Sequence, residues 1–269
     1  MNKLRIGLEM ISVKDVSPKD LCAVISEVGK VGYEGVEFAR GYFGKTLPQV
    51  KQALKDAGLV AISDHIHIDL MRKDLNKVID GCLFLGMHYA AVLGGFDETR
   101  DITEAEFGAY TDEIRRYGEA FSRAGVRLAI HGSTAFFQRD RKGTTLFERV
   151  LAAIEPRCLH AQVDTAWALC GGEDPARFIA KFSGRMEMVH IKDFHPPMPS
   201  GDIYEIRDQA MGQDCPIGDE GIQDVPKIIE ACRSAEVEWL IVEHMEKEHY
   251  DDSIAATAVS LRNIKTAMK

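Results

Sequence analysis

The strongest constraint on the fold is a regular alternation along the chain, in which a short run of β-forming residues is followed by a helical pattern about eight times over. The β-forming runs are rich in Val, Ile, Leu and Ala. Several lack strict polar alternation, which is typical of strands covered on both faces. These runs are RIGLEMIS (5–12), EGVEFA (34–39), LVAISDHI (59–66), YAAVLGG (89–95), VRLAIHGS (126–133), LHAQVDT (159–165), EMVHIKDF (187–194) and EWLIVEHM (238–245).

The segments between these runs carry signals for the start and end of helices. Ser17-Pro18 followed by Asp20 offers an N-cap, a proline in the first turn and an acid near the positive helix end. Thr103 followed by Glu106 has the capping-box pattern, and Asp174-Pro175 predicts another helix start. Helix ends are expected at five glycines, Gly29, Gly32, Gly58, Gly86 and Gly125.

A chain of 269 residues has the length of one (β/α)8 TIM barrel, and we predict a single barrel domain over residues 1–269. The rival is an open, doubly wound sheet. Because no GxGxxG motif follows the first strand, the dinucleotide-binding form of that rival is disfavoured. The one long irregular stretch, residues 195–221, is rich in Pro, Gly and Asp, and loops of this length are more often functional than idle.

Composition excludes some classes of protein. The chain is 45% hydrophobic and 28% charged, has no apolar run long enough to span a membrane, and begins without the apolar region of a secretory signal. A net charge of −9 weighs against a nucleic-acid binder. The six scattered cysteines form no CxxC pair and predict free thiols in the reducing cytoplasm. We therefore expect a cytoplasmic protein with a small-molecule partner, and neither a nucleic acid nor a membrane as partner.

Ionisable residues fall at the carboxyl ends of nearly all the predicted strands. In a barrel these ends converge on one mouth, so charge would be concentrated there. The stretch MVHIKDF shows the pattern most clearly, because a buried strand ends in three ionisable side chains. The residues at these ends are Glu9, Glu37, Asp64, His65, His131, Asp164, His190, Lys192, Glu243 and His244.

Four of these residues have the chemistry of a metal site. His131, Asp164, His190 and Glu243 combine imidazoles and carboxylates, which suit a borderline divalent ion better than Ca²⁺. Neutral His190 would bind the ion, and Lys192 would face a substrate oxygen. We expect one ion per chain, Mn²⁺, Co²⁺, Mg²⁺, Fe²⁺ or Zn²⁺, without a choice among them.

Each residue also has a structural interpretation. A lone strand histidine is commonly a hydrogen-bonded core residue, and Asp164 before Thr165 can cap a turn. Glu9, Glu37 and Glu243 can pair with basic neighbours. Lys192 and Asp193 can form an exposed ion pair.

Four stretches resemble the sugar phosphate isomerase/epimerase superfamily with the xylose-isomerase-like barrel, which includes inosose dehydratases and ketose 3-epimerases. The most specific stretch has an Asp on the sixth strand, a Trp shortly after it, a GxDP helix start and an HxKD strand end. The four stretches are GVEFARGYFGKT, DHIHIDLMRKDLNKVIDGCLFLGMHYAAV, QVDTAWALCGGEDPARFIAKFSGRMEMVHIKD and PIGDEGIQDVPKIIEACRSAEVEWLIVEHM.

The resemblance implies one divalent ion at the barrel mouth, held by Glu, Asp, His and Glu of strands five to eight. Asp164, His190 and Glu243 match this pattern, whereas the fifth strand ends in His131 instead of a glutamate. In the epimerases the two glutamates face each other across the substrate and shuttle a proton. Only Glu243 of that pair is present, so His131 is either a ligand or a base. The family's polar partner three residues after the sixth-strand Asp is replaced by Trp167.

The implied function is a metal-dependent isomerase or epimerase of a sugar, sugar phosphate or cyclitol, acting through a metal-bound enediolate. Glu243 or His131 would remove the proton beside the carbonyl, and Lys192 would stabilise the oxyanion or protonate a leaving hydroxyl. Trp167 would form an apolar wall, a subunit contact or simple packing, and Arg207 would bind a phosphate or carboxylate or lie in solvent. Hydroxyl groups would be oriented by Glu9, Glu37 and His65.

Other outcomes stay open on the same site. If a β-hydroxyl leaves, the enzyme is a dehydratase of a keto-sugar or inosose. Two other classes are a multi-zinc apurinic-site endonuclease, which needs more ligands and a DNA-binding surface, and a non-catalytic sugar-binding relative. Homo-oligomers are common in the family, but no stripe of residues fixes the number of subunits.

Overall fold

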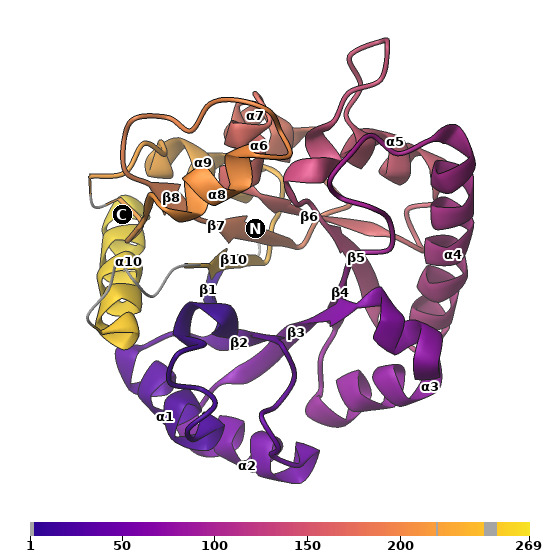
Figure 1. Ribbon diagram of the computed structural model, residues 1–269. Coiled ribbons are helices and arrows are strands. Elements are labelled where there is room, and N and C mark those ends of the chain that lie inside the picture. The colour runs from indigo at the N-terminus through magenta and orange to yellow at the C-terminus, as the bar shows by residue number, and fades with distance from the viewer. Residues whose placement is uncertain (1–2, 219, 245–251) are drawn as a thin grey trace.

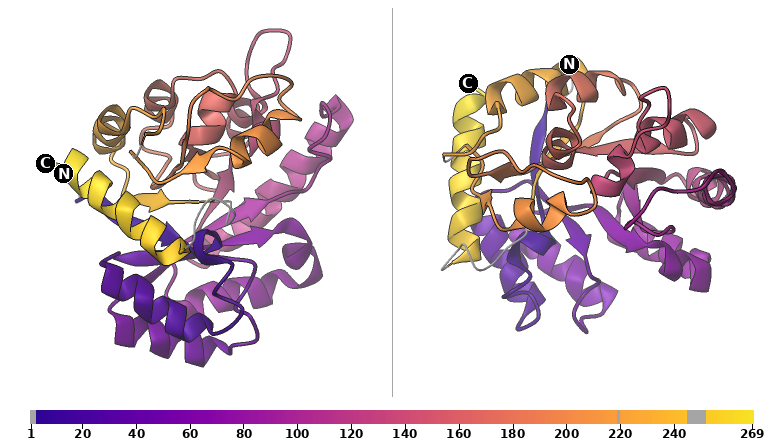
Figure 2. Two further views of the ribbon diagram at one scale, coloured as in Figure 1. Left: turned by 60° about the vertical axis from the view of Figure 1, so that its left-hand side comes forward. Right: turned by 45° about the horizontal axis from the view of Figure 1, so that its top comes forward.

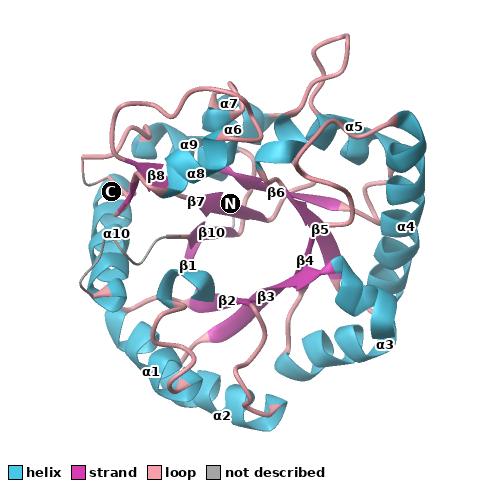
Figure 3. Cartoon of the chain, viewed as in Figure 1, coloured by secondary structure: helices cyan, strands magenta, loops and turns pink. Residues whose placement is uncertain are grey.

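The computed structural model describes residues 3–218, 220–244 and 252–269, which form a closed barrel of eight parallel strands (Figures 1 and 3). The barrel closes because β1 (Arg5–Glu9) pairs with both β2 (Gly35–Ala39) and β10 (Trp239–Val242). The predicted (β/α)8 fold is therefore confirmed, and the open sheet is excluded. The remaining barrel strands are β3 (Val60–His67), β4 (Tyr89–Leu93), β5 (Arg127–His131), β6 (His160–Asp164) and β7 (Met188–Ile191).

Each predicted strand coincides with an observed one, with small differences at the ends; β3, for example, runs one residue beyond the predicted strand, to His67. The first strand is shorter than predicted, because Met10–Val13 form the 3-10 helix η1. The last residue of the predicted eighth strand, Met245, lies outside the described residues. All residues of β2, β7 and β10 are buried, as expected for strands with the barrel interior on one side and helices on the other.

The helices surround the barrel (Figure 2). In the part of the chain that the structure describes, none is both long and apolar enough to cross a membrane. The α-helices are α1 (Leu21–Val31), α2 (Leu47–Ala57), α3 (Ile68–Leu85), α4 (Glu104–Arg123), α5 (Leu146–Ala153), α6 (Thr165–Cys170), α7 (Pro175–Ala180), α8 (Ile206–Met211), α9 (Val225–Ser234) and α10 (Ser253–Ala267), and a second 3-10 helix is η2 (Thr134–Phe137).

Local sequence signals fix most helix boundaries. Thr103 and Glu106 form the predicted capping box of α4, and Asp174 caps α7. Two predictions were off by a few residues. Asp20, not Ser17, is the N-cap of α1, because the Asp20 carboxylate accepts from the backbone N–H of Cys22. Gly29 lies inside α1, which ends at Gly32, where the backbone takes the left-handed conformation.

The inside of the barrel contains an apolar layer beneath a polar one. The apolar layer is a small cluster of residues from five strands, Ile62, Tyr89, Ala129, Met188, Trp239 and Ile241. The pairing of β2 with β3 slips by one residue between Val36 and Glu37. As a result two consecutive residues face inward, Ile62 in the apolar cluster and Ser63 against Glu37. The slip thus marks the boundary between the two layers.

The long segment after β7 is partly regular. It contains α8 and a short antiparallel pair of strands, β8 (Asp193–Phe194) and β9 (Asp214–Cys215), which the sequence did not predict. The buried carboxylate of Asp193 accepts from the backbone N–H groups of Gly218 and Gln223, and so draws the end of the segment onto the barrel.

A close approach between α4 and the chain leading into β6 gives a test of the packing. A Cβ atom at Gly118 would lie 2.0 Å from the backbone oxygen of Cys158, whereas a Cβ atom at Gly108 on the same helix meets nothing within 4 Å. Gly118→Ala should lower the free energy of unfolding by about 1–3 kcal/mol through overpacking. Gly108→Ala should raise it by roughly 1 kcal/mol, because alanine favours the helix. Urea unfolding of both variants measures the difference, and equal effects would contradict the packing.

Candidate active site

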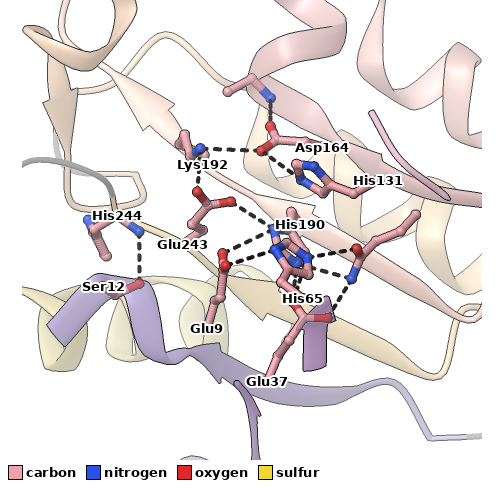
Figure 4. A network of polar contacts seen from close by, with 12 residues as sticks. Glu9, Ser12, Glu37, His65, His131, Asp164, His190, Lys192, Glu243 and His244 are labelled. Carbon is pink, nitrogen blue, oxygen red and sulfur yellow. Dashed lines mark hydrogen bonds and ion pairs between the residues drawn. The ribbon is translucent and has the colours of Figure 1, made fainter. Parts of the chain in front are cut away.

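Ionisable side chains from seven of the eight barrel strands meet at the carboxyl end of the barrel (Figure 4). This is the end where TIM-barrel enzymes place their active sites. The spacing of these side chains follows from the pairing of the strands, which sets Asp164 beside His190 and Glu37 beside Ser63. The buried residues of the mouth are Glu9, Glu37, His65, His131, Gln162, Asp164, His190, Lys192 and Glu243.

Two of these side chains, His131 and Asp164, face each other with atoms that make no hydrogen bond. The Nε2 atom of His131 lies 3.8 Å from Oδ2 of Asp164, and neither atom has a hydrogen-bond partner. The other oxygen of Asp164 accepts from the backbone N–H groups of Ala166 and Trp167 and so caps α6. The capping role and the site role of Asp164 therefore coexist, because each uses a different oxygen.

His190 lies at the centre of the cluster. Its Nδ1 atom is 2.7 Å from Oε2 of Glu243 and 3.5 Å from Oε2 of Glu9. Its Nε2 atom contacts Oε2 of Glu37 on the opposite side of the ring. The ring of His65 stacks on it with centroids 5.0 Å apart, and Nδ1 of His65 is 3.0 Å from Oε1 of Glu9.

Lys192 is fully buried, and its positive charge compensates the negative charges of two carboxylates. Its Nζ atom donates to Oε1 of Glu243 at 2.7 Å and lies 3.3 Å from Oδ2 of Asp164. The ammonium group also lies 4.4 Å from the centroid of the Trp167 ring, within range of a cation–π contact. An exposed ion pair between Lys192 and Asp193 is therefore wrong, because both side chains are buried with other partners.

Burial and neighbouring charges shift the pKa values of the basic groups. Burial lowers the pKa of His131 to about 4, so this imidazole is neutral at pH 7. Burial also acts against the charge on His190, but Glu37, Glu243 and Glu9 outweigh it and hold the pKa of His190 well above its usual value. The pKa of Lys192 is raised in the same way, by Asp164 and Glu243 against the effect of burial.

The carboxylates divide into two kinds. Burial, and then the charge of Glu243, raise the pKa of Glu9 to about 7. Burial would raise the pKa of Glu37 as well, but His65 and His190 outweigh it and lower that pKa to about 2. Lys192 similarly overcomes burial and holds the pKa of Glu243 well below its usual range. Glu37 and Glu243 are thus permanent charges near neutral pH, whereas Glu9 is close to its midpoint.

A cavity of about 300 Å³ opens above this cluster. Arg207 of α8 and Arg40, which follows β2, lie at its rim, and Arg40 has a left-handed backbone conformation with φ of 63°. Among the predicted site residues, those lining the cavity are Glu9, His65, His131, Trp167, Arg207 and Glu243. Those buried around it without lining it are Glu37, Asp164, His190 and Lys192.

The residues present fit a divalent metal ion. His131, Asp164, His190 and Glu243 each offer one ligand atom, and these atoms lie within 4.8 Å of one another. Nε2 of His131 and Oδ2 of Asp164 make no hydrogen bond, so both have a lone pair to offer to an ion, although Oδ2 also lies 3.3 Å from the ammonium group of Lys192. Two imidazoles and two carboxylates form a donor set that suits Zn²⁺, Mn²⁺, Co²⁺ or Fe²⁺.

Sequence reasoning missed two members of the cluster. Gln162 of β6 accepts from Nε2 of His65 at 2.9 Å and donates to Oε1 of Glu37 at 2.8 Å. Ser63 of β3 donates to the same oxygen of Glu37. Gln162 precedes Asp164 by two residues and therefore faces the same side of β6. This two-residue spacing is the sequence signal that could have identified it.

The buried position of Lys192 has a measurable consequence. Lys192→Met leaves Asp164 and Glu243 without a compensating charge and should lower the free energy of unfolding of the metal-free protein by about 3–5 kcal/mol. The control is Lys227→Met, because Lys227 forms an exposed pair with Asp174. The control should change stability by less than about 1 kcal/mol. Denaturant unfolding of both variants tests this, and a small loss for Lys192→Met would contradict the charge compensation.

Comparison with known proteins shows what the chain is similar to. A curated relative, the inosose dehydratase of Geobacillus kaustophilus (strain HTA426), is 25% identical over 222 residues, which are 72% of this chain and 70% of that protein. A solved sugar phosphate isomerase/epimerase of Parabacteroides distasonis ATCC 8503 superposes with a TM-score of 0.80 at 19% identity, covering 100% of this chain and 96% of that one. A solved L-ribulose 3-epimerase superposes with a TM-score of 0.74 at 16% identity, covering 99% and 96%.

The two solved structures show a shared fold, and the family follows from a family model that matches most of the chain. A family model described as the xylose isomerase-like TIM barrel matches residues 25–265, which include seven of the eight barrel strands. The resemblance seen in the sequence is thereby confirmed. The chain belongs to the family of xylose isomerase-like TIM barrels.

Proposed function

We propose that this chain is a divalent-metal-dependent enzyme that transfers a proton next to the carbonyl of a small sugar, sugar phosphate or cyclitol. The observation that carries the proposal is a pair of buried atoms without a hydrogen bond, Nε2 of His131 and Oδ2 of Asp164, which lie within reach of His190 and Glu243 below an open cavity. The ion would act as a Lewis acid that polarises the carbonyl. His131, Asp164, His190 and Glu243 would hold it.

Two residues qualify as the base that removes the proton. Glu243 lines the cavity and stays ionised because Lys192 bonds to its other side. His131 lines the cavity as a neutral imidazole. Loss of the proton moves an electron pair from the C–H bond onto the carbonyl oxygen and gives an enediolate. Lys192 does not line the cavity, so its ammonium group would stabilise that negative charge from behind Glu243, to which it donates.

The cavity walls would orient the substrate. Glu9 and His65 offer polar atoms to hydroxyl groups, and the buried indole of Trp167 offers an apolar face. Arg207 at the rim would meet a phosphate or carboxylate, if the substrate carries one. Glu37 lies below the cavity and not on its wall, so an indirect role suits it better than contact with substrate.

The enediolate has more than one outcome on such a site. Return of the proton to the neighbouring carbon is isomerisation, and return to the opposite face is epimerisation. Loss of a β-hydroxyl as water is dehydration, our second candidate. It is favoured by His131 at the end of β5, because two-glutamate epimerisation needs a carboxylate there. The inosose dehydratase relative is consistent with that alternative.

Metal content tests the first part of the proposal. The protein purified without chelator should contain close to one divalent ion per chain by mass spectrometry, and His190→Ala should lose both the ion and turnover. His131→Ala should weaken binding if His131 is a ligand, and should retain the ion if His131 is the base. An absence of metal in the wild type, even after addition of Mn²⁺ or Co²⁺, would point to a non-catalytic sugar-binding protein.

Turnover in D₂O tests the second part and separates the outcomes. With keto-sugars and inososes as substrates, isomerisation or epimerisation places deuterium on the product carbon, whereas dehydration gives an unsaturated product. Glu243→Gln should lower kcat by about 10²–10⁴-fold, as expected for loss of a catalytic base. Glu98→Gln is the matched control, because Glu98 lines the same cavity but bonds to Ser133. Equal losses in both variants would contradict the role of Glu243.

A further inference from the structure

The rings of His65 and His190 are held from below by one polar group, which we call the floor. The floor consists of Glu37, Ser63 and Gln162, all fully buried. Nε2 of His190 contacts Oε2 of Glu37, and Nε2 of His65 lies 2.9 Å from Oε1 of Gln162. Both imidazoles therefore direct the same ring nitrogen, Nε2, toward the floor (Figure 4).

The hydrogen bonds of the floor admit one arrangement. Oε1 of Glu37 accepts from the hydroxyl of Ser63 and from the amide N–H of Gln162. With its amide nitrogen toward Glu37, Gln162 turns its carbonyl oxygen to His65, which must donate. Reversing the amide would set that carbonyl against the carboxylate, which cannot donate. The orientation of Gln162 is thus fixed by the charge of Glu37.

The same reasoning locates a proton on His190. Oε2 of Glu37 is an acceptor only, so Nε2 of His190 must carry the proton between them. The amide nitrogen of Gln162, 3.1 Å from this Nε2, is also a donor and cannot share the proton. On the opposite side of the ring, Nδ1 points to Glu243 and Glu9 at 2.7 and 3.5 Å. By the same argument Nδ1 donates to the carboxylate of Glu243 while no ion is bound, and Nδ1 is thus the atom that faces this other candidate ligand.

We propose that Glu37 is a positioning residue that holds the proton on Nε2 of His190 and so presents Nδ1 to a metal ion. Ser63 and Gln162 hold the carboxylate of Glu37 in turn. A carboxylate behind a metal-bound histidine fixes the orientation of the ring and raises its basicity. The affinity part of this inference rests on the proposed metal-dependent function, whereas the position of the proton does not.

Nuclear magnetic resonance of ¹⁵N-labelled histidine rings tests the position of the proton directly. The signals of His190 are assigned from their absence in His190→Ala. In metal-free and in Zn²⁺-loaded wild type, Nε2 of His190 should carry a slowly exchanging proton, and Zn²⁺ should shift the resonance of Nδ1. In Glu37→Gln the proton on Nε2 should exchange faster. Zn²⁺ bound at Nε2, with the proton on Nδ1, would overturn the inference.

Calorimetric titration with Zn²⁺ tests the effect on binding. Glu37→Gln should raise the Kd by about 10–100-fold, and Ser63→Ala should raise it less, because only one partner of Glu37 is lost. Asp64→Asn is the matched control: this neighbouring carboxylate accepts from Tyr42 and makes no contact with His190, so affinity should be unchanged. An unchanged Kd in Glu37→Gln would also overturn the inference.

Failure of the inference and failure of the proposed function are distinguishable. If wild-type protein binds no Zn²⁺, the proposed function fails, but the proton on Nε2 in the metal-free protein still decides the role of Glu37. If wild type binds Zn²⁺ and Glu37→Gln binds it equally well, the function stands and the inference fails. Thermal unfolding of each variant shows whether it is folded, and the measurements on wild type need no variant of Glu37.

Discussion

The barrel mouth depends on the mutual neutralisation of buried charges. Glu9, Glu37, Asp164 and Glu243 are removed from water together with Lys192 and three histidines. A buried charge without a partner is costly, so each carboxylate has to lie close to a cation. Lys192 between Asp164 and Glu243, and His190 between Glu37 and Glu243, meet that requirement.

The barrel makes this arrangement possible because its strands are short, parallel and covered on both faces. Apolar residues fill the lower interior, so polar side chains are confined to one end. The slip between β2 and β3 places Ser63 under Glu37, at the boundary of the two layers. The polar residues of the mouth are thus placed at the ends of strands, whereas Arg207 reaches the rim from the segment that contains α8.

The site differs from the pattern implied by its family at one informative position. His131 stands at the end of β5, and burial keeps its ring neutral with an unused nitrogen toward Asp164. A neutral imidazole can still bind a metal ion, but it replaces one of two opposed glutamates. Metal binding can therefore be retained with a histidine at this position, while the two-glutamate proton transfer of an epimerase is lost. That loss is the reason why dehydration remains a candidate beside isomerisation.

The sequence by itself determined the barrel, the positions of its strands and most of the charged strand ends. Local spacing carries that information, because strand periodicity and caps depend on near neighbours. Only the tertiary structure decided which of these residues face the cavity, that Lys192 is buried, and that Gln162 and Ser63 complete the cluster. The contact of Glu37 with His190 joins residues 153 positions apart. Such pairs arise when the barrel closes, and no local pattern in one sequence encodes them.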